Sequence, residues 1–165
     1  MGFLLHRVSQ PSQPSRFHSE LQFTIKTSRP GICYNAGFML NLYLMENKKT
    51  LVLGASLNTS RYSNLAINRL VAYKHPVVAV GLRKGEVAGV PIATEKESFE
   101  EVDTVTLYLN PKRQVEYYDY ILSLNPQRVI FNPGTENPEL FELLKKNKIE
   151  FEVACTLIML GTNQY

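Results

Sequence analysis

The stretch LVLGASLNTSRYSN, residues 51–64, decides the fold class. Three apolar residues lead into Gly54, a polar loop follows, and a helical pattern begins near Arg61. A strand that ends in a glycine turn and opens onto a helix is a common phosphate site in α/β proteins, because the free N–H groups at the helix start attract anions. The usual dinucleotide-binding turn has three glycines, whereas this stretch has one. The question is therefore which ligand a loop with a single glycine binds.

The loop offers several polar groups next to the expected helix start. Ser56, Asn58, Thr59 and Ser60 supply hydroxyl and amide groups, and Gly54 permits a sharp turn or the close approach of a ligand. Two interpretations remain open at this point. The loop is an anion-binding site, or its serine and threonine side chains cap the helix.

From residue 49 onward, short apolar segments alternate with helical patterns. Continuous apolar strands between helices indicate a parallel sheet that is covered on both faces. We predict a doubly wound, mostly parallel α/β domain of the Rossmann-like class. The expected strands are residues 50–54, 76–81, 104–109, 128–131 and 151–155, with a short extended piece at 90–94. The expected helices are residues 61–73, a short acidic helix at 95–102, and two helices after residues 109 and 136.

The helix starts and the buried helix faces follow from local pattern. Asn110-Pro111 and Asn137-Pro138 are favourable starts, because asparagine caps a helix and proline suits its first turn. Helical spacing then predicts the residues that face the sheet. They are Leu65, Ala66, Leu70 and Val71 in the first long helix, Val115, Tyr118, Ile121 and Leu122 in the second, and Leu140, Phe141 and Leu144 in the third.

The first 44 residues differ in composition from the rest. Residues 9–20 (SQPSQPSRFHSE) are rich in Ser, Gln and Pro without periodic pattern, which is typical of disorder. Residues 35–44 (NAGFMLNLYL) are apolar but too short to span a bilayer, so we expect no membrane association. We predict that residues 1–44 are a disordered or non-native extension before Met45, or else a targeting segment, and that residues 45–165 form the domain.

The positive charge belongs to the same N-terminal stretch. Residues 1–44 hold four of the 18 basic and one of the 15 acidic residues, which leaves 14 of each sign in residues 45–165. The body therefore lacks the basic patch that nucleic-acid binding requires. The two cysteines, Cys33 and Cys155, give neither a disulfide framework nor a metal-ligand spacing. We expect a cytoplasmic protein without a metal site.

The end of the second expected strand separates two classes of nucleotide. NAD-binding domains usually place Asp or Glu there to bind the ribose hydroxyls, but this chain continues from Gly81-Leu82 into Arg83 and Lys84. These two cations would attract a phosphorylated ribose. Coenzyme A, with its 3′-phosphate, and NADP both meet that condition, although a solvated turn would have the same sequence.

Five blocks in order carry a resemblance to a known family: GAS…RYSN, VGLRKGEVAGVPI, VTLYLNP, RVIFNPGTEN and ACTLIML. Residues 47–165 resemble the CoA-binding domain family, stand-alone proteins similar to the N-terminal domain of the succinyl-CoA synthetase α subunit. The resemblance implies that the first loop holds the CoA phosphates and that the basic turn faces the adenosine phosphate. The implied ligand-binding residues are Gly54, Ala55, Ser56, Thr59, Ser60, Arg61, Ser63, Asn64, Arg83, Lys84, Asn110, Pro111, Asn132, Gly134 and Thr135, with Leu109 and Glu136 nearby.

The chain departs from the synthetase pattern where chemistry would occur. It has no histidine after His75 that would correspond to the phosphorylated histidine of the synthetase, and His75 itself is expected at the surface, away from the ligand. Cys155 follows an apolar strand, where a cysteine usually acts as a small hydrophobe. The sequence therefore predicts no catalytic residues.

We expect a non-catalytic module that binds CoA or an acyl-CoA as a sensor or regulatory protein. This role is compatible with a homo-oligomer or a protein partner. Two alternatives remain. One is an NADP-dependent or other nucleotide-dependent enzyme, although Tyr117 and Tyr118 lack the lysine four residues later that a Tyr-x-x-x-Lys pair requires. The other is a subunit that completes an acyl-CoA ligase in trans.

Overall fold

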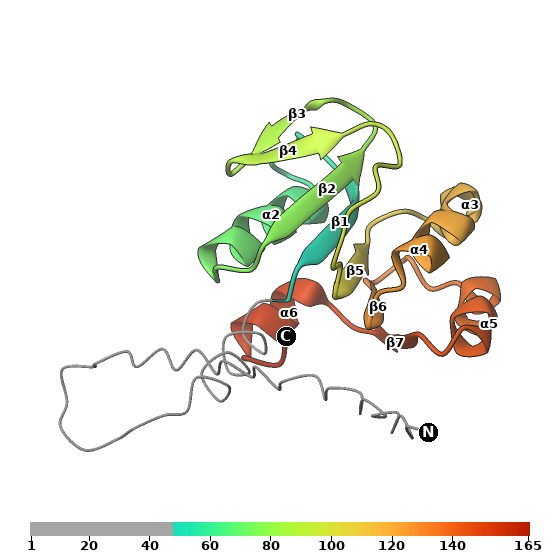
Figure 1. The fold of residues 1–165 in the computed structure, drawn as a ribbon. Helices are drawn as coiled ribbons and strands as arrows, with labels where there is room; N and C mark the ends of the chain where they lie inside the picture. The colour runs from blue at the N-terminus through green and yellow to red at the C-terminus, as the bar shows by residue number, and fades with distance from the viewer. Residues whose placement is uncertain (1–47) are drawn as a thin grey trace, which may run out of the picture. The chain divides into compact units, whose positions relative to one another are not determined.

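A computed structural model describes residues 48–165, so the predictions for residues 1–44 and for Cys33 lie outside the described part. Within it, seven strands form one sheet in the order β3-β4-β2-β1-β5-β6-β7 (Figure 1). The strands are β1 (Thr50–Ala55), β2 (Val77–Gly81), β3 (Gly85–Val87), β4 (Val90–Ala93), β5 (Thr104–Leu107), β6 (Arg128–Phe131) and β7 (Glu150–Val153). All neighbouring strands are parallel except the antiparallel pair β3 and β4. The predicted doubly wound α/β class is confirmed.

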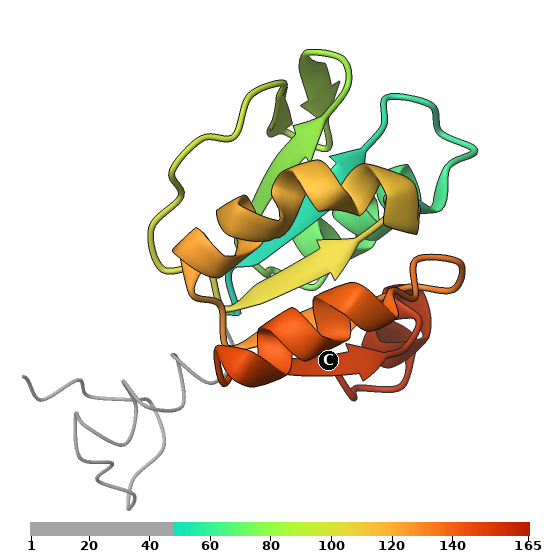
Figure 2. The ribbon, with the colours of Figure 1, turned by 90° about the vertical axis from the view of Figure 1, so that its right-hand side faces the viewer.

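Helices cover both faces of the sheet. The helices are α2 (Tyr62–Ala72), α3 (Pro111–Gln114), the 3-10 turn η1 (Val115–Tyr117), α4 (Tyr118–Leu124), α5 (Pro138–Lys146) and α6 (Thr156–Gly161). Figure 2 shows α5 and the α3–α4 segment side by side in front of the sheet, with α2 behind it. Alternation along β1 explains the two layers of core, because Leu51 and Leu53 face α4 and α5 while Val52 faces α2.

The predicted helix faces are correct in part. Ala66, Leu70, Leu140 and Leu144 are fully buried, but Leu65 is 41% exposed and Val115 is 55% exposed. The buried face of α2 also includes Ser63, Asn64 and Ile67, which lie beside Ala66 and Leu70 and were not in the predicted set. The η1 turn interrupts the second long helix and changes the helical phase around Val115.

Three elements differ from the prediction. The acidic segment 95–102 forms no helix. It carries four glutamates and no helix cap, and one of its backbone carbonyls, that of Glu97, accepts a hydrogen bond from the Tyr120 hydroxyl at 2.7 Å. The segment after Lys84 forms the β3–β4 hairpin around Ala88 and Gly89, both with positive φ, as a two-residue hairpin turn requires. Helix α6 was not predicted, because its apolar run TLIML follows directly after the last strand.

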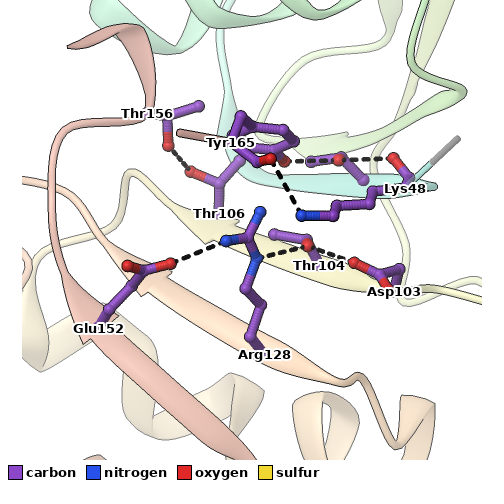
Figure 3. Close-up of polar contacts among 9 residues, drawn as sticks. Lys48, Asp103, Thr104, Thr106, Arg128, Glu152, Thr156 and Tyr165 are labelled. Carbon is purple, nitrogen blue, oxygen red and sulfur yellow. Dashed lines mark hydrogen bonds and ion pairs between the residues drawn. The ribbon is translucent and has the colours of Figure 1, made fainter. Parts of the chain in front are cut away.

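Aromatic and charged side chains close the amino end of the sheet (Figure 3). The Tyr165 ring lies 4.9 Å from the His75 ring and 4.8 Å from the Arg128 guanidinium carbon, and its hydroxyl lies 2.6 Å from the Thr50 hydroxyl. Arg128 also donates to Glu152 at 2.9 Å. Burial is the main reason why the pKa of Tyr165 rises to about 12. His75 is therefore half-buried against Tyr165, and its predicted surface position is wrong.

Candidate functional site

A cleft of about 710 Å³ lies at the carboxyl ends of β1, β2, β5 and β6. The chain leaves β1 toward β2 on one side, whereas β5 pairs with β1 on the other side. The cleft is therefore at the topological switch point, where open α/β sheets bind their ligands. Its walls come from residues 54–63, 80–83, 108–117 and 133–135, with gaps in each range.

Gly54 is required by the packing of the protein itself. It has φ +95° at a bulge in β1, and a Cβ there would lie 2.9 Å from the carbonyl carbon of Tyr108. Gly81, at the end of β2, is equally constrained, because its Cβ would lie 2.3 Å from the Ala55 carbonyl oxygen. These two glycines let the loops after three adjacent strands approach each other closely, and the cleft floor depends on that approach.

Hydrogen bonds within the β1–α2 loop fix its shape. The Ser56 hydroxyl accepts from the Asn58 N–H at 3.2 Å, and the Asn58 side chain accepts from the Ser60 N–H at 2.9 Å. The Asn64 amide donates to the Ser56 carbonyl at 2.9 Å, which ties the loop to the helix. The serine and asparagine side chains thus bond to the loop and leave the start of α2 uncapped.

The N-terminus of α2 has free donors. Its N-cap residue, Arg61, makes no side-chain capping bond, and within residues 48–165 no acceptor contacts the backbone N–H of Tyr62 or Ser63. Of the two interpretations of the loop, helix capping by Ser or Thr is therefore wrong. A free helix N-terminus beside a cleft favours an anion.

Three arginines line the cleft: Arg61, Arg83 and Arg113. No aspartate or glutamate belongs to the described lining, and none of the three arginines takes part in the ion pairs found within residues 48–165. Cations without partners in a concave site raise the local positive potential. The cleft is therefore electrostatically suited to a ligand with several negative charges.

The β5 and β6 side of the cleft rests on a buried network of amides. The Gln114 amide donates to the carbonyls of Leu109 and Thr135 at 2.8 and 2.7 Å, and the Asn137 amide donates to the Gln114 side chain at 2.9 Å. Asn137 also caps α5, and Asn110 caps α3 by accepting from Arg113 N–H. Both predicted asparagine caps are confirmed. This network positions Leu109, Asn110 and Thr135 at the cleft wall.

The structure brings together most of the residues predicted for the ligand. Those that line the cleft are Gly54, Ala55, Ser56, Arg61, Ser63, Arg83, Asn110, Gly134 and Thr135. Those outside its lining are Thr59, Ser60, Asn64, Lys84, Pro111 and Asn132. Asn132 is buried, and its side chain bonds Thr106, Leu107 and Thr156, so that it joins β5, β6 and α6. Its position suggests a role in shaping the site.

Several lining residues were missed by the sequence reasoning. Asn58 was expected as a polar group of the loop and Leu109 as a neighbour of the ligand. The lining residues without a predicted role are Leu57, Tyr62, Val80, Gly81, Leu82, Tyr108, Arg113, Tyr117 and Pro133. The signal for Arg113 was available, because it lies in the first turn of a helix that follows β5. Nothing in the sequence distinguishes it from Lys112, which is exposed and does not line the cleft.

A tyrosine and a cysteine lie close together near the cleft. Burial raises the pKa of Tyr108 to about 12, although the nearby Thr156 and Thr106 hydroxyls act in the opposite direction. Cys155 is half-buried at the N-cap of α6 and does not line the cleft. Within residues 48–165 no group of His, Cys, Asp and Glu could hold a metal ion, and no helix is long and apolar enough to cross a membrane.

The fold is a Rossmann-like α/β fold, and the charges of the cleft at its switch point suit a polyanionic ligand. The family model described as a CoA binding domain matches residues 48–161. The chain belongs to this CoA-binding domain family, as the five sequence blocks predicted.

Solved structures agree with the fold. An uncharacterized protein of known crystal structure is 54% identical, with a TM-score of 0.70 over 72% of this chain and 98% of its own. A Thermus thermophilus protein has 23% identity and a TM-score of 0.67, and covers 77% of this chain and 97% of its own. The dinucleotide-forming acetyl-coenzyme A synthetase 1 of Ca. Korarchaeum cryptofilum, solved with phosphate and ADP, has 16% identity and a TM-score of 0.56 over 68% of this chain and 27% of its own. No curated protein matches the chain.

Proposed function

We propose that the protein is a non-catalytic module that binds coenzyme A or an acyl-CoA in the cleft between β1 and β5, as a sensor or regulatory protein. The observation that carries the proposal is that three unpaired arginines line the same cleft as the free N-terminus of α2. CoA has a diphosphate and a separate 3′-phosphate, so its anionic groups match a cleft with cations on two sides. Membership of the CoA-binding domain family supports the same ligand.

In the proposed complex, the diphosphate lies at the N-terminus of α2. The backbone N–H groups of Tyr62 and Ser63 and the side chain of Arg61 are the donors available there. Arg83, at the end of β2, binds the 3′-phosphate. Lys84 lies outside the cleft lining, so we assign this contact to Arg83 alone.

The lining favours binding over chemistry. Its polar residues are arginines, serines, threonines, tyrosines and asparagines, and its described part has no carboxylate, imidazole, lysine or thiol. Of the side chains that usually act as general acids or bases, the described lining holds only tyrosines, and burial raises the pKa of one of them, Tyr108, to about 12. The geometry therefore supports a protein that recognises CoA.

The test compares CoA with dephospho-CoA by calorimetry in the wild type, R83A and K84A. One charge-assisted hydrogen bond is worth about 1.5–3 kcal/mol, so CoA should bind roughly 10- to 100-fold more tightly than dephospho-CoA. R83A should remove most of this difference, and the matched control K84A should keep it. Equal affinities for both ligands in the wild type would refute the assignment of Arg83. The absence of binding by either ligand would refute the proposed function.

A further inference from the structure

This inference rests on the proposed function and concerns how two parts of the anion site are held relative to each other. The first part is the basic turn, residues 82–84, which joins β2 to β3 and carries Arg83. The second part is the β1–α2 loop, residues 56–61, which carries Arg61 and leads to the free N-terminus of α2. The two segments are distant in the chain, but both line the cleft.

Both ends of the basic turn rest against the end of β1 and the loop after it. Gly81, before the turn, pairs with Ala55, and a Cβ at Gly81 would lie 2.3 Å from the Ala55 carbonyl oxygen. Gly85, after the turn, faces Leu57, and a Cβ at Gly85 would lie 2.7 and 2.8 Å from the two δ-carbons of Leu57. Non-bonded carbon atoms pack at about 3.5–4.0 Å, so the contact between Gly85 and Leu57 requires a glycine.

The hairpin that follows the basic turn is anchored independently of this contact. Val87 of β3 and Val90 of β4 belong to the same core layer as Ile67 of α2. Loss of the contact at Gly85 should therefore leave the hairpin folded and loosen only the turn. Leu57 is 40% exposed and lines the cleft, so its contact with Gly85 contributes little to the core and lies at the site itself.

We propose that the contact between Leu57 and Gly85 is a positioning contact, which fixes the separation between Arg83 and the anion site at the start of α2. In CoA the 3′-phosphate and the diphosphate are attached to the same ribose, so the separation of these groups is limited. A site held at the matching separation favours CoA over a ligand that lacks one of the two groups. The contact acts on this preference through Arg83, because a turn that is ordered before binding loses less conformational entropy when the ligand binds.

The test measures the dissociation constants of CoA and dephospho-CoA by calorimetry in the wild type, G85A and L57A. A methyl group at residue 85 must displace the Leu57 side chain, whereas L57A removes the contact without adding bulk. Each variant should weaken CoA roughly 3- to 10-fold, the range expected when one flexible side chain must be ordered on binding. Dephospho-CoA should stay within about twofold of its wild-type affinity, because it has no group for Arg83 to bind.

G161A is the matched control for G85A. Neither glycine has a positive φ, but Gly161 lies in α6, and its Cβ would make only an ordinary contact of 3.5 Å, with the Arg69 side chain. G161A should therefore leave the affinities for both ligands unchanged. Melting curves within a few degrees of the wild type would show that a change of preference in G85A or L57A does not come from unfolding. If G85A does not fold, L57A alone tests the contact.

The outcomes separate this inference from the proposed function. If the wild type prefers CoA and both G85A and L57A keep that preference, the inference is wrong and the proposed function stands. If L57A weakens both ligands equally, Leu57 contacts the ligand directly, and the inference is again wrong. If the wild type binds both ligands equally, Arg83 does not bind the 3′-phosphate, and the inference fails together with that assignment. If neither ligand binds, the proposed function itself fails.

Discussion

At the amino end of the sheet, the guanidinium of Arg128 bonds Glu152 and Thr104 and lies against the Tyr165 ring. At the carboxyl end, Arg61, Arg83 and Arg113 face a cleft with no carboxylate in its described lining. The same side-chain type is thus paired at one end and unpaired at the other. An arginine that stabilises the fold has its hydrogen-bond and ion-pair partners within the protein. An arginine that binds a ligand has such partners only in the complex.

The largest effect that tests this comparison is expected from G54V. A valine Cβ at Gly54 would contact the Tyr108 backbone and would require a positive φ, so overpacking and backbone strain together should cost roughly 2–6 kcal/mol. Chemical denaturation should show this loss of stability without any ligand. G134A is the control, because Gly134 also has positive φ but an open surrounding, and it should lose only about 1–2 kcal/mol. Equal losses in the two variants would show that the packing argument for the cleft floor is incorrect.

A second variant tests the opposite end of the sheet. Y165A removes the aromatic ring between His75 and Arg128 and should lower the stability by about 2–3 kcal/mol, less than for a fully buried aromatic residue because Tyr165 is partly exposed. Y165F loses only the contact with Thr50 and should cost about 1 kcal/mol. Neither variant should change the CoA affinity of the folded protein more than about twofold, since the site lies at the other end. A large change in affinity would mean that the two ends are coupled.

The pH dependence of stability should reveal the environment of His75. Burial first, and then the charges of Lys48 and Arg128, lower the pKa of His75, so the folded state resists its protonation. The unfolded chain then binds more protons than the folded one below about pH 6.5. The free energy of unfolding should therefore decline as the pH falls from about 6.5 toward the lowered pKa of His75 in the folded state. Above about pH 6.5 it should remain level. H75Q should weaken this decline in a series of denaturation curves, and an unchanged slope would contradict the assignment to His75.

The smallest effect is expected from deletion of residues 1–44. Their composition lacks the pattern needed to pack against a sheet, and the charges of residues 45–165 are balanced without them. The truncated chain should unfold cooperatively with a stability within about 1 kcal/mol of the full chain, a shift of a few degrees in Tm. Calorimetric scans of the two chains would measure this. A much larger loss of Tm would make the N-terminal stretch part of the fold.

The sequence was sufficient for the parallel core and insufficient for the features that shape the cleft. Buried strands such as β1 and β6 are predictable, because a short uninterrupted apolar run is typical of a strand that is covered on both faces of a parallel sheet. The hairpin β3–β4 and the 3-10 turn η1 depend on local backbone conformations that composition does not determine. Leu65 shows the same limit, because the packing of α2 on the sheet decides which side of its apolar face is buried, and the helical period alone does not.

The candidate site was predictable where a residue lies in the turn after a strand, as Arg83 does after β2, or at the start of the helix after β1, as Arg61 does. It was not predictable where the choice lies between adjacent residues of one type, such as Arg83 against Lys84 or Arg113 against Lys112. In each pair, helix phase or turn geometry decides which cation lines the cleft. The sequence also assigned to Gly54 a role toward the ligand, while the structure places the backbone of Tyr108 against it.

The hydrogen bonds of Ser56, Asn58 and Asn64 within the β1–α2 loop have a kinetic consequence. A loop that is already ordered loses little conformational entropy when a ligand binds, so preorganisation increases the affinity. Association should then follow a single bimolecular phase, because no slow rearrangement precedes or follows the encounter. Differences in affinity between ligands should appear as differences in residence time.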